Sequence, residues 1–83
     1  METKKTYTDN FIYCGNNIYK NNYYGNPIYK IHFVYENYVY AELFTPADYK
    51  TIAFFNQLKY GTKVIISYHY DARAKRNIID AYD

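Results

Sequence analysis

The chain has 83 residues, with 10 Lys or Arg against 8 Asp or Glu. This length fits a single domain, residues 1–83, and excludes a multidomain enzyme. No stretch approaches the roughly 18 apolar residues of a membrane span, and no signal-peptide core follows the first residues. The single cysteine, Cys14, supplies neither an internal disulfide nor a zinc cluster, which favours a reducing, cytoplasmic compartment.

Tyrosine dominates the composition. The chain holds 14 Tyr, whereas Val, Ile and Leu together also number only 14 (3, 9 and 2). Because so few aliphatic side chains cannot fill a core, some tyrosines must be buried, each with a hydrogen-bond partner. The remaining tyrosines are expected on the surface. Phe, Tyr, Met, Ile, Asn and Lys account for 46 of 83 residues, a bias that follows A/T-rich codons and indicates an A/T-rich bacterium, its phage or a mobile element.

Alternating patterns predict the first strands. Residues 6–14 are expected to form a strand, and a turn-rich loop with three Tyr and one Lys follows at 15–27. Residues 28–35 and 38–44 alternate between two faces and are separated by two turn-type residues, which predicts a hairpin. With the aliphatic sets toward the core, the outer face of this hairpin carries Lys30, His32, Tyr38 and Tyr40.

A helix with one apolar face is expected at 46–59. Thr45 supplies an N-cap hydroxyl, Pro46 suits the first helical position, and Asp48 places a carboxylate in the first turn. Its apolar positions fall within about 160° of a helical wheel, so the helix should pack against a sheet. Gly61 supplies its stop.

Two more strands are expected at 62–71 and 76–82, joined by a loop at 72–75. In the first of them, the residues facing the core are Val64, Ile66 and Tyr68. The order of three strands, a helix and two strands resembles the OB-fold, a five-stranded Greek-key barrel with a helix between its third and fourth strands. The resemblance covers nearly the whole chain, rests on element order, and implies a closed or nearly closed barrel with the helix over one end.

No arrangement typical of a catalytic or metal site occurs. His32 and His69 sit in different predicted strands, and no carboxylate pair or cysteine adjoins either of them in sequence. The motifs GxxxxGK[ST], GxGxxG, HExxH and CxxC are absent from the sequence. Cys14 is expected to be a small buried hydrophobe in a strand, not a nucleophile. We therefore expect a protein without enzymatic activity, cofactor or metal.

The surplus tyrosines and several cations fall where an OB-fold binds single strands. Flat aromatic rings on a sheet accept bases by stacking, and adjacent cations follow the phosphates. In OB-folds the loops between the first and second strands and between the fourth and fifth strands flank the binding cleft. The expected nucleic-acid-binding residues are Lys30, His32, Tyr38 and Tyr40 on the sheet, Tyr19, Lys20, Tyr23 and Tyr24 in the first loop, and Arg73, Lys75 and Arg76 in the last loop.

Each of these groups also has a purely structural interpretation. Cross-strand tyrosine pairs stabilise a solvated sheet face, loop tyrosines can close one end of a barrel, and a charged hairpin tip can simply be solvated. The net charge of +2 is small for a nucleic-acid binder. Affinity would then depend on stacking more than on charge.

Two functions remain open. The first is sequence-tolerant binding of single-stranded DNA or RNA, similar to the small OB-fold single-stranded-DNA-binding proteins of phages and mobile elements. The second is a protein-interaction module, such as a phage- or element-encoded inhibitor or a replication accessory subunit, whose tyrosines form an interface. Because the aliphatic core is lean and exposed tyrosines are adhesive, we expect a homodimer or a hetero-complex, and no membrane partner.

Overall fold

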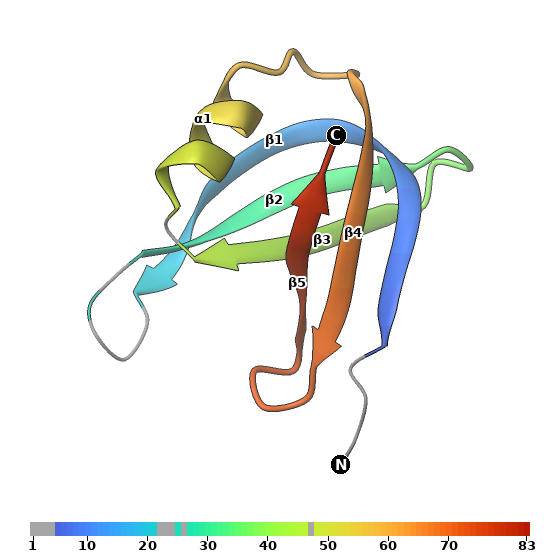
Figure 1. Cartoon of the computed structure of the whole chain (residues 1–83). Coiled ribbons are helices and arrows are strands. Elements are labelled where there is room, and N and C mark those ends of the chain that lie inside the picture. The colour runs from blue at the N-terminus through green and yellow to red at the C-terminus, as the bar shows by residue number, and fades with distance from the viewer. Residues whose placement is uncertain (1–4, 22–24, 26, 47) are drawn as a thin grey trace.

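The computed structural model describes residues 5–21, 25, 27–46 and 48–83, with only the backbone of Lys20, Asn21 and Pro46. Five strands form a closed barrel in the order β1-β2-β3-β5-β4, and one helix follows β3 (Figure 1). This confirms the predicted OB-like barrel and its element order. The elements are β1 (Thr6–Asn21), β2 (Pro27–Tyr35), β3 (Tyr40–Pro46), α1 (Tyr49–Asn56), β4 (Lys63–Asp71) and β5 (Arg76–Tyr82).

Strand β1 is longer than predicted and pairs with two neighbours. It pairs antiparallel with β4 up to Ile12 and with β2 from Phe11 onward. Register shifts interrupt the β1–β2 ladder between Tyr13 and Asn16 and again before Lys20, and such bulges bend a strand and increase its twist. The predicted loop at 15–27 is therefore wrong in its first part, because the bulged strand continues to pair with β2.

Gly15 lies inside the first of these bulges. Its φ of 109° belongs to a region that residues with a Cβ rarely adopt. Two backbone hydrogen bonds fix the neighbouring Tyr13, whose N–H donates to the Thr62 carbonyl and whose carbonyl accepts from the Gly61 N–H, both at 2.8 Å. The bend therefore depends on the positive φ of Gly15 and on the hydrogen bonds between Tyr13 and the segment before β4.

The turn between β2 and β3 is wider than the two residues predicted. The Tyr38 N–H donates to the Tyr35 carbonyl, and the Tyr35 N–H donates to the Val39 carbonyl, each at 2.8 Å. Tyr38 has a left-handed φ of 66°. The expected placement of Tyr38 on the third strand is therefore wrong, because the chain uses four turn residues and β3 begins at Tyr40.

Helix α1 begins three residues later than predicted. Thr45 and Pro46 pair with Tyr29 and Ile28 and so complete β3. The N-cap is Asp48, whose carboxylate accepts hydrogen bonds from the Lys50 N–H at 3.3 Å and from the Thr51 hydroxyl at 2.7 Å. The expected N-cap, Thr45, is therefore wrong, because this residue pairs in β3, and Asp48, expected in the first turn, caps the helix instead.

The helix also ends earlier than predicted. It stops at Asn56, with Gln57 as the C-cap. Gly61, the expected stop, instead lies in the following turn with a φ of 93° and bonds to β1 as described above. No helix in the described part of the chain is long and apolar enough to cross a membrane.

The core is built largely from aromatic rings. Phe11, Phe33 and Phe55 are fully buried. Phe55 of α1 packs against Tyr13 and Phe33 with ring centroids 6.0 and 5.8 Å apart, so the helix covers one end of the barrel (Figure 1). The predicted core residues of β4 are confirmed as buried: Val64, Ile66 and Tyr68.

Two buried tyrosines have the polar partners that burial demands. The Tyr68 hydroxyl donates to the Asp9 carboxylate at 2.5 Å, and the Tyr13 hydroxyl accepts from Asn16 Nδ2 at 2.6 Å. Burial is the main cause that raises the pKa of both phenols. Both side chains therefore remain neutral donors or acceptors at physiological pH.

Gly15→Ala is expected to destabilise the protein more than Gly61→Ala. Both positions have positive φ, so alanine carries backbone strain of about 1–3 kcal/mol at each. At Gly15 the new Cβ would also lie 2.8 Å from the Tyr60 hydroxyl oxygen, whereas nothing lies within 4 Å of it at Gly61. Urea denaturation should show the larger loss at Gly15, and adding Tyr60→Ala should remove the excess. Equal losses at the two glycines would contradict a crowded bend.

Candidate nucleic-acid interface

The outward-facing residues of β2 and β3 form one continuous surface. Alternation along β2 buries Ile31 and Phe33 and turns Lys30 and His32 outward. Cross-strand pairing then sets Lys30 opposite Phe44, His32 opposite Glu42, and Val34 opposite Tyr40. We call the surface made by these six residues the outer face: Lys30, His32, Val34, Tyr40, Glu42 and Phe44.

A chain of polar contacts crosses the outer face. His32 Nε2 lies 2.5 Å from Asn17 Oδ1 of β1, and His32 Nδ1 lies 2.5 Å from the Tyr40 hydroxyl. That hydroxyl donates to Glu42 Oε1 at 2.9 Å. The second carboxylate oxygen of Glu42 is 3.5 Å from Lys30 Nζ. Three strands are therefore connected by one network of side chains.

Tyr40 combines an available ring with a shielded hydroxyl. The residue is 54% exposed, yet its oxygen lies between His32 and Glu42. Desolvation of the hydroxyl, followed by its hydrogen bond to Glu42 and the charge of Glu42, raises the pKa of Tyr40. The phenol is held in place as a neutral donor while its ring remains accessible.

Two cations lie on one pair of rings at the other end of the outer face. Tyr19 and Phe44 meet edge to face, with centroids 5.2 Å apart. Lys30 Nζ lies 4.7 Å from the Tyr19 centroid and 5.7 Å from the Phe44 centroid. Arg76 Cζ lies 5.4 and 5.1 Å from the same two centroids. These are cation–π distances, and we call Tyr19, Lys30, Phe44 and Arg76 the cation–ring cluster.

The cluster explains the burial of Phe44. This residue points away from the core but is only 8% exposed, because Tyr19, Lys30 and Arg76 surround it. Arg76 reaches it because β5 runs parallel to β3, with Phe44 opposite Ile78. Its Nε–H donates to the Ala74 carbonyl at 3.2 Å, and its buried Nη1 has no hydrogen-bond partner among the described residues.

The structure brings together five of the eleven predicted binding residues, and it places others elsewhere. Tyr38 lies in the β2–β3 turn and is 82% exposed. Arg73 and Lys75 lie in the β4–β5 turn, where the Asp71 carboxylate accepts from the Arg73 N–H at 2.9 Å. Tyr23, Tyr24 and the side chain of Lys20 lie outside the described residues. The five that meet are Tyr19, Lys30, His32, Tyr40 and Arg76.

Sequence reasoning missed three residues that take part in these side-chain contacts. Glu42 and Phe44 share the alternating face of Tyr40, so the signal for them was present in the hairpin pattern. Asn17 had no such signal, because it was assigned to a loop. Only the bulged course of β1 places Asn17 beside His32.

One expectation about a chemically active residue is corrected, and one contact is found that the sequence did not show. Cys14 is exposed, not buried, because it lies in the bulge between Tyr13 and Asn16. His69 does have a carboxylate beside it in space, since its Nδ1 is 2.9 Å from both oxygens of Asp80 across the β4–β5 ladder. The described residues contain no group of three His, Cys, Asp or Glu side chains arranged to hold a metal ion.

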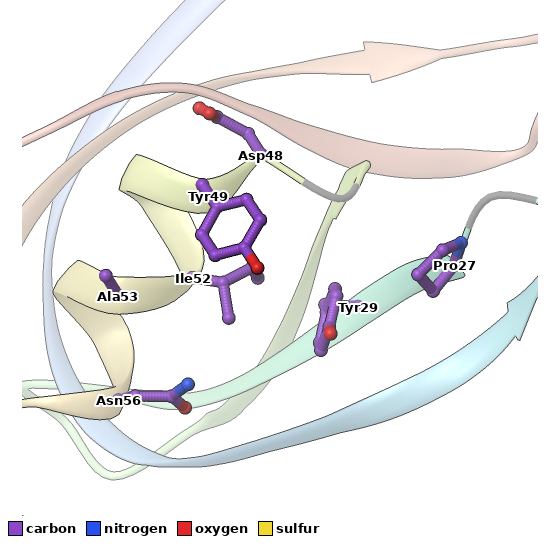
Figure 2. A pocket seen from close by; sticks show the side chains of 7 residues that line it. All are labelled: Pro27, Tyr29, Asp48, Tyr49, Ile52, Ala53 and Asn56. Carbon is purple, nitrogen blue, oxygen red and sulfur yellow. The ribbon is translucent and has the colours of Figure 1, made fainter.

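A separate hollow of about 450 Å³ lies between α1 and the start of β2. Figure 2 shows the rings of Tyr29 and Tyr49 and the amide of Asn56 around it. Asn56 Oδ1 accepts from Asn16 Nδ2 at 3.1 Å, which leaves its amide N–H groups for another partner. Because Tyr29 and Lys30 are successive residues of β2, the hollow and the outer face lie on opposite sides of this strand.

Comparisons with known protein families, curated proteins and solved structures found no match to this chain. The chemistry of the outer face therefore has to be derived from its own residues. Those residues supply accessible aromatic rings, two cations and one carboxylate in a connected arrangement.

The Cys14 thiol is expected to react with Ellman's reagent in the native protein. An exposed thiol needs no unfolding to meet the reagent, and the chain contains one cysteine. The native reaction should release one equivalent at the same amplitude as the reaction in denaturant. A native sample that reacts only after denaturant is added would show that Cys14 is buried, as the sequence alone predicted.

Proposed function

We propose that the protein binds single-stranded DNA or RNA across the outer face, in a sequence-tolerant manner and without catalysis. The observation that carries this proposal is the cation–ring cluster, in which Lys30 and Arg76 flank the same two rings. Base stacking on aromatic rings combined with cations that follow the backbone is how single strands are bound without base readout.

The outer face offers two stacking positions on either side of its polar network. Tyr40 is 54% exposed and Tyr19 is 45% exposed, so each ring has free area. Tyr19 packs edge to face against Phe44. Phe44 lies four residues after Tyr40 on β3, which corresponds to about 13 Å along the strand. An oligonucleotide of a few residues spans that length, within the site size of about 4–16 nucleotides of OB-folds.

Electrostatics contribute less than stacking in this arrangement. The described residues of the outer face and the cluster include two cations, Lys30 and Arg76, and one carboxylate, Glu42. Glu42 pairs with Lys30 at 3.5 Å. One carboxylate thus offsets one of the two cations. Affinity should accordingly depend strongly on the two tyrosines and only moderately on salt.

A second candidate is the protein-interaction module, as a homodimer or with a protein partner. The observation that favours it is a set of exposed large side chains away from the outer face. Tyr49 is 95% exposed, and Tyr38, Val39 and Tyr60 are among the other exposed residues. Tyrosine is enriched in protein interfaces as well as in nucleic-acid sites, so the two functions are separated by experiment.

Tyr40→Ala and Tyr19→Ala should each weaken oligo(dT) binding by about 1–3 kcal/mol, roughly 5- to 150-fold. The loss should be similar for other base compositions, because every base has a π face. Quenching of tyrosine fluorescence measures the affinity directly, since the chain has no Trp. Tyr38→Ala is the matched control, because this ring lies in the turn and not on the outer face.

Unchanged affinity in both Tyr40→Ala and Tyr19→Ala would remove the stacking surface from the proposal. If those variants instead lose self-association by light scattering, the outer face is a protein interface. A loss of affinity in Tyr38→Ala equal to that in Tyr40→Ala would move the binding site toward the β2–β3 turn.

Arg76→Gln and Lys30→Gln should each flatten the log–log salt dependence of binding by about 0.7, the slope for one phosphate of a single strand. Glu42→Gln should act in the opposite direction and steepen the salt dependence, because it frees Lys30 from its carboxylate. Lys59→Gln is the control, since Lys59 follows α1 and lies in neither the outer face nor the cluster. A slope that falls equally in Lys59→Gln would show that net charge, not the cluster, controls binding.

A further inference from the structure

The hydrogen bonds of Asn17 indicate that one ring nitrogen of His32, Nε2, carries a proton. Asn17 Nδ2 donates to the Ile18 carbonyl at 3.0 Å, which fixes the orientation of the amide. Its oxygen therefore faces His32 Nε2, at 2.5 Å. An amide oxygen only accepts hydrogen bonds, so Nε2 must be the donor in this contact.

The second ring nitrogen of His32, Nδ1, faces the Tyr40 hydroxyl, whose O–H already donates a hydrogen bond to Glu42. A phenol has one O–H, and that of Tyr40 donates to Glu42 Oε1 at 2.9 Å. The raised pKa of Tyr40 keeps that proton on the phenol. While the phenol donates to Glu42, its oxygen can only accept from His32 Nδ1, at 2.5 Å, so in that arrangement Nδ1 is also a donor.

A neutral imidazole satisfies both contacts only if Tyr40 gives up its hydrogen bond to Glu42. Its single N–H is needed by Asn17 Oδ1, so Nδ1 would have to accept from the Tyr40 hydroxyl. With a neutral His32, Tyr40 would turn its proton toward Nδ1 and leave its own oxygen 2.9 Å from an unprotonated carboxylate oxygen of Glu42. Two acceptors at that distance repel each other. Only the imidazolium form keeps the Tyr40–Glu42 hydrogen bond together with both contacts of His32, so the network can hold His32 in either protonation state according to which acceptor the Tyr40 hydroxyl faces.

The charged and titratable groups around His32 come from three strands. On β3, Glu42 and the Tyr40 phenol lie beside it, and on β2 the Lys30 ammonium is held on the far oxygen of Glu42. On β1, Asn17 is neutral, and the Cys14 thiol interacts with Tyr40. Glu42 and Lys30 thus place opposite charges on the network that includes His32.

We propose that His32 is doubly protonated in the nucleic-acid complex, and that binding of the phosphate backbone takes up a proton at this ring. This inference rests on the proposed function. Lys30, Arg76 and Glu42 together leave one net positive charge, and an imidazolium doubles it. Because coupling between two bound species is reciprocal, phosphates that favour the proton must bind more tightly when the proton is present.

The first test measures oligo(dT) affinity and its salt slope at pH 5.5 and pH 8. Affinity should fall by up to about tenfold per pH unit as the bound proton is lost, and the slope should be about 0.7 steeper at pH 5.5. His32→Gln keeps polar contacts but cannot titrate in this range, so its affinity should be nearly flat with pH. The only other histidine of the chain supplies the control, because His69→Gln should retain the full pH dependence.

The second test detects the protonation of the His32 ring directly and needs no affinity measurement. Nitrogen-15 NMR of the imidazole rings distinguishes a ring with two N–H groups from one with a single N–H. At pH 7 the doubly protonated fraction of His32 should rise when oligo(dT) is added, and that of His69 should not change.

The outcomes separate the two proposals. If oligo(dT) binds but leaves the protonation of His32 unchanged, or if His32→Gln keeps the pH dependence, the proton coupling is wrong and the binding function stands. If oligo(dT) binds at neither pH 5.5 nor pH 8, the proposed function fails and the coupling fails with it.

Discussion

The bend of strand β1 is the constraint on which both the core and the candidate site depend. Before the bend, Phe11 and Tyr13 point into the barrel and pack against Phe33. After it, Asn17 and Tyr19 reach the outer face and contact His32 and Lys30. Without the extra residue of the bulge, alternation would leave Asn17 and Tyr19 on the same face as Phe11 and Tyr13, toward the interior. Closing the barrel and assembling the site are thus one structural event.

The aromatic composition has a second consequence, because a phenol brings a polar group wherever it packs. Tyr68 and Tyr13 fill the core only because Asp9 and Asn16 meet their hydroxyls. The same rule operates on the outer face, where Glu42 and His32 meet the hydroxyl of Tyr40. A chain with few aliphatic residues therefore needs a polar partner for each tyrosine hydroxyl that it shields from water, and this need determines much of its side-chain network.

The sequence predicted what depends on local alternation and failed where pairing between distant segments decides. Period-two patterns were sufficient to turn Lys30 and His32 outward, to bury Ile66, and to set the order of the elements. They could not reveal that Thr45 belongs to β3, because a capping residue and a strand-end residue look alike until the partner strand is known. The contact of Arg76 with Phe44 likewise depends on the parallel β3–β5 pairing, which no nearby residues encode.

Glu42 shows why a weakly charged face can still suit a polyanion. The carboxylate lowers the positive charge, and for a binder that relied on counterion release this would be a defect. Yet Glu42 holds both Lys30 and the Tyr40 hydroxyl, so the cation and the ring are positioned before any ligand arrives. Ordered rings lose less conformational entropy on binding than mobile ones. In the proposed complex the outer face would exchange some electrostatic attraction for preorganised stacking, and a protonated His32 would restore the missing charge without releasing the ring.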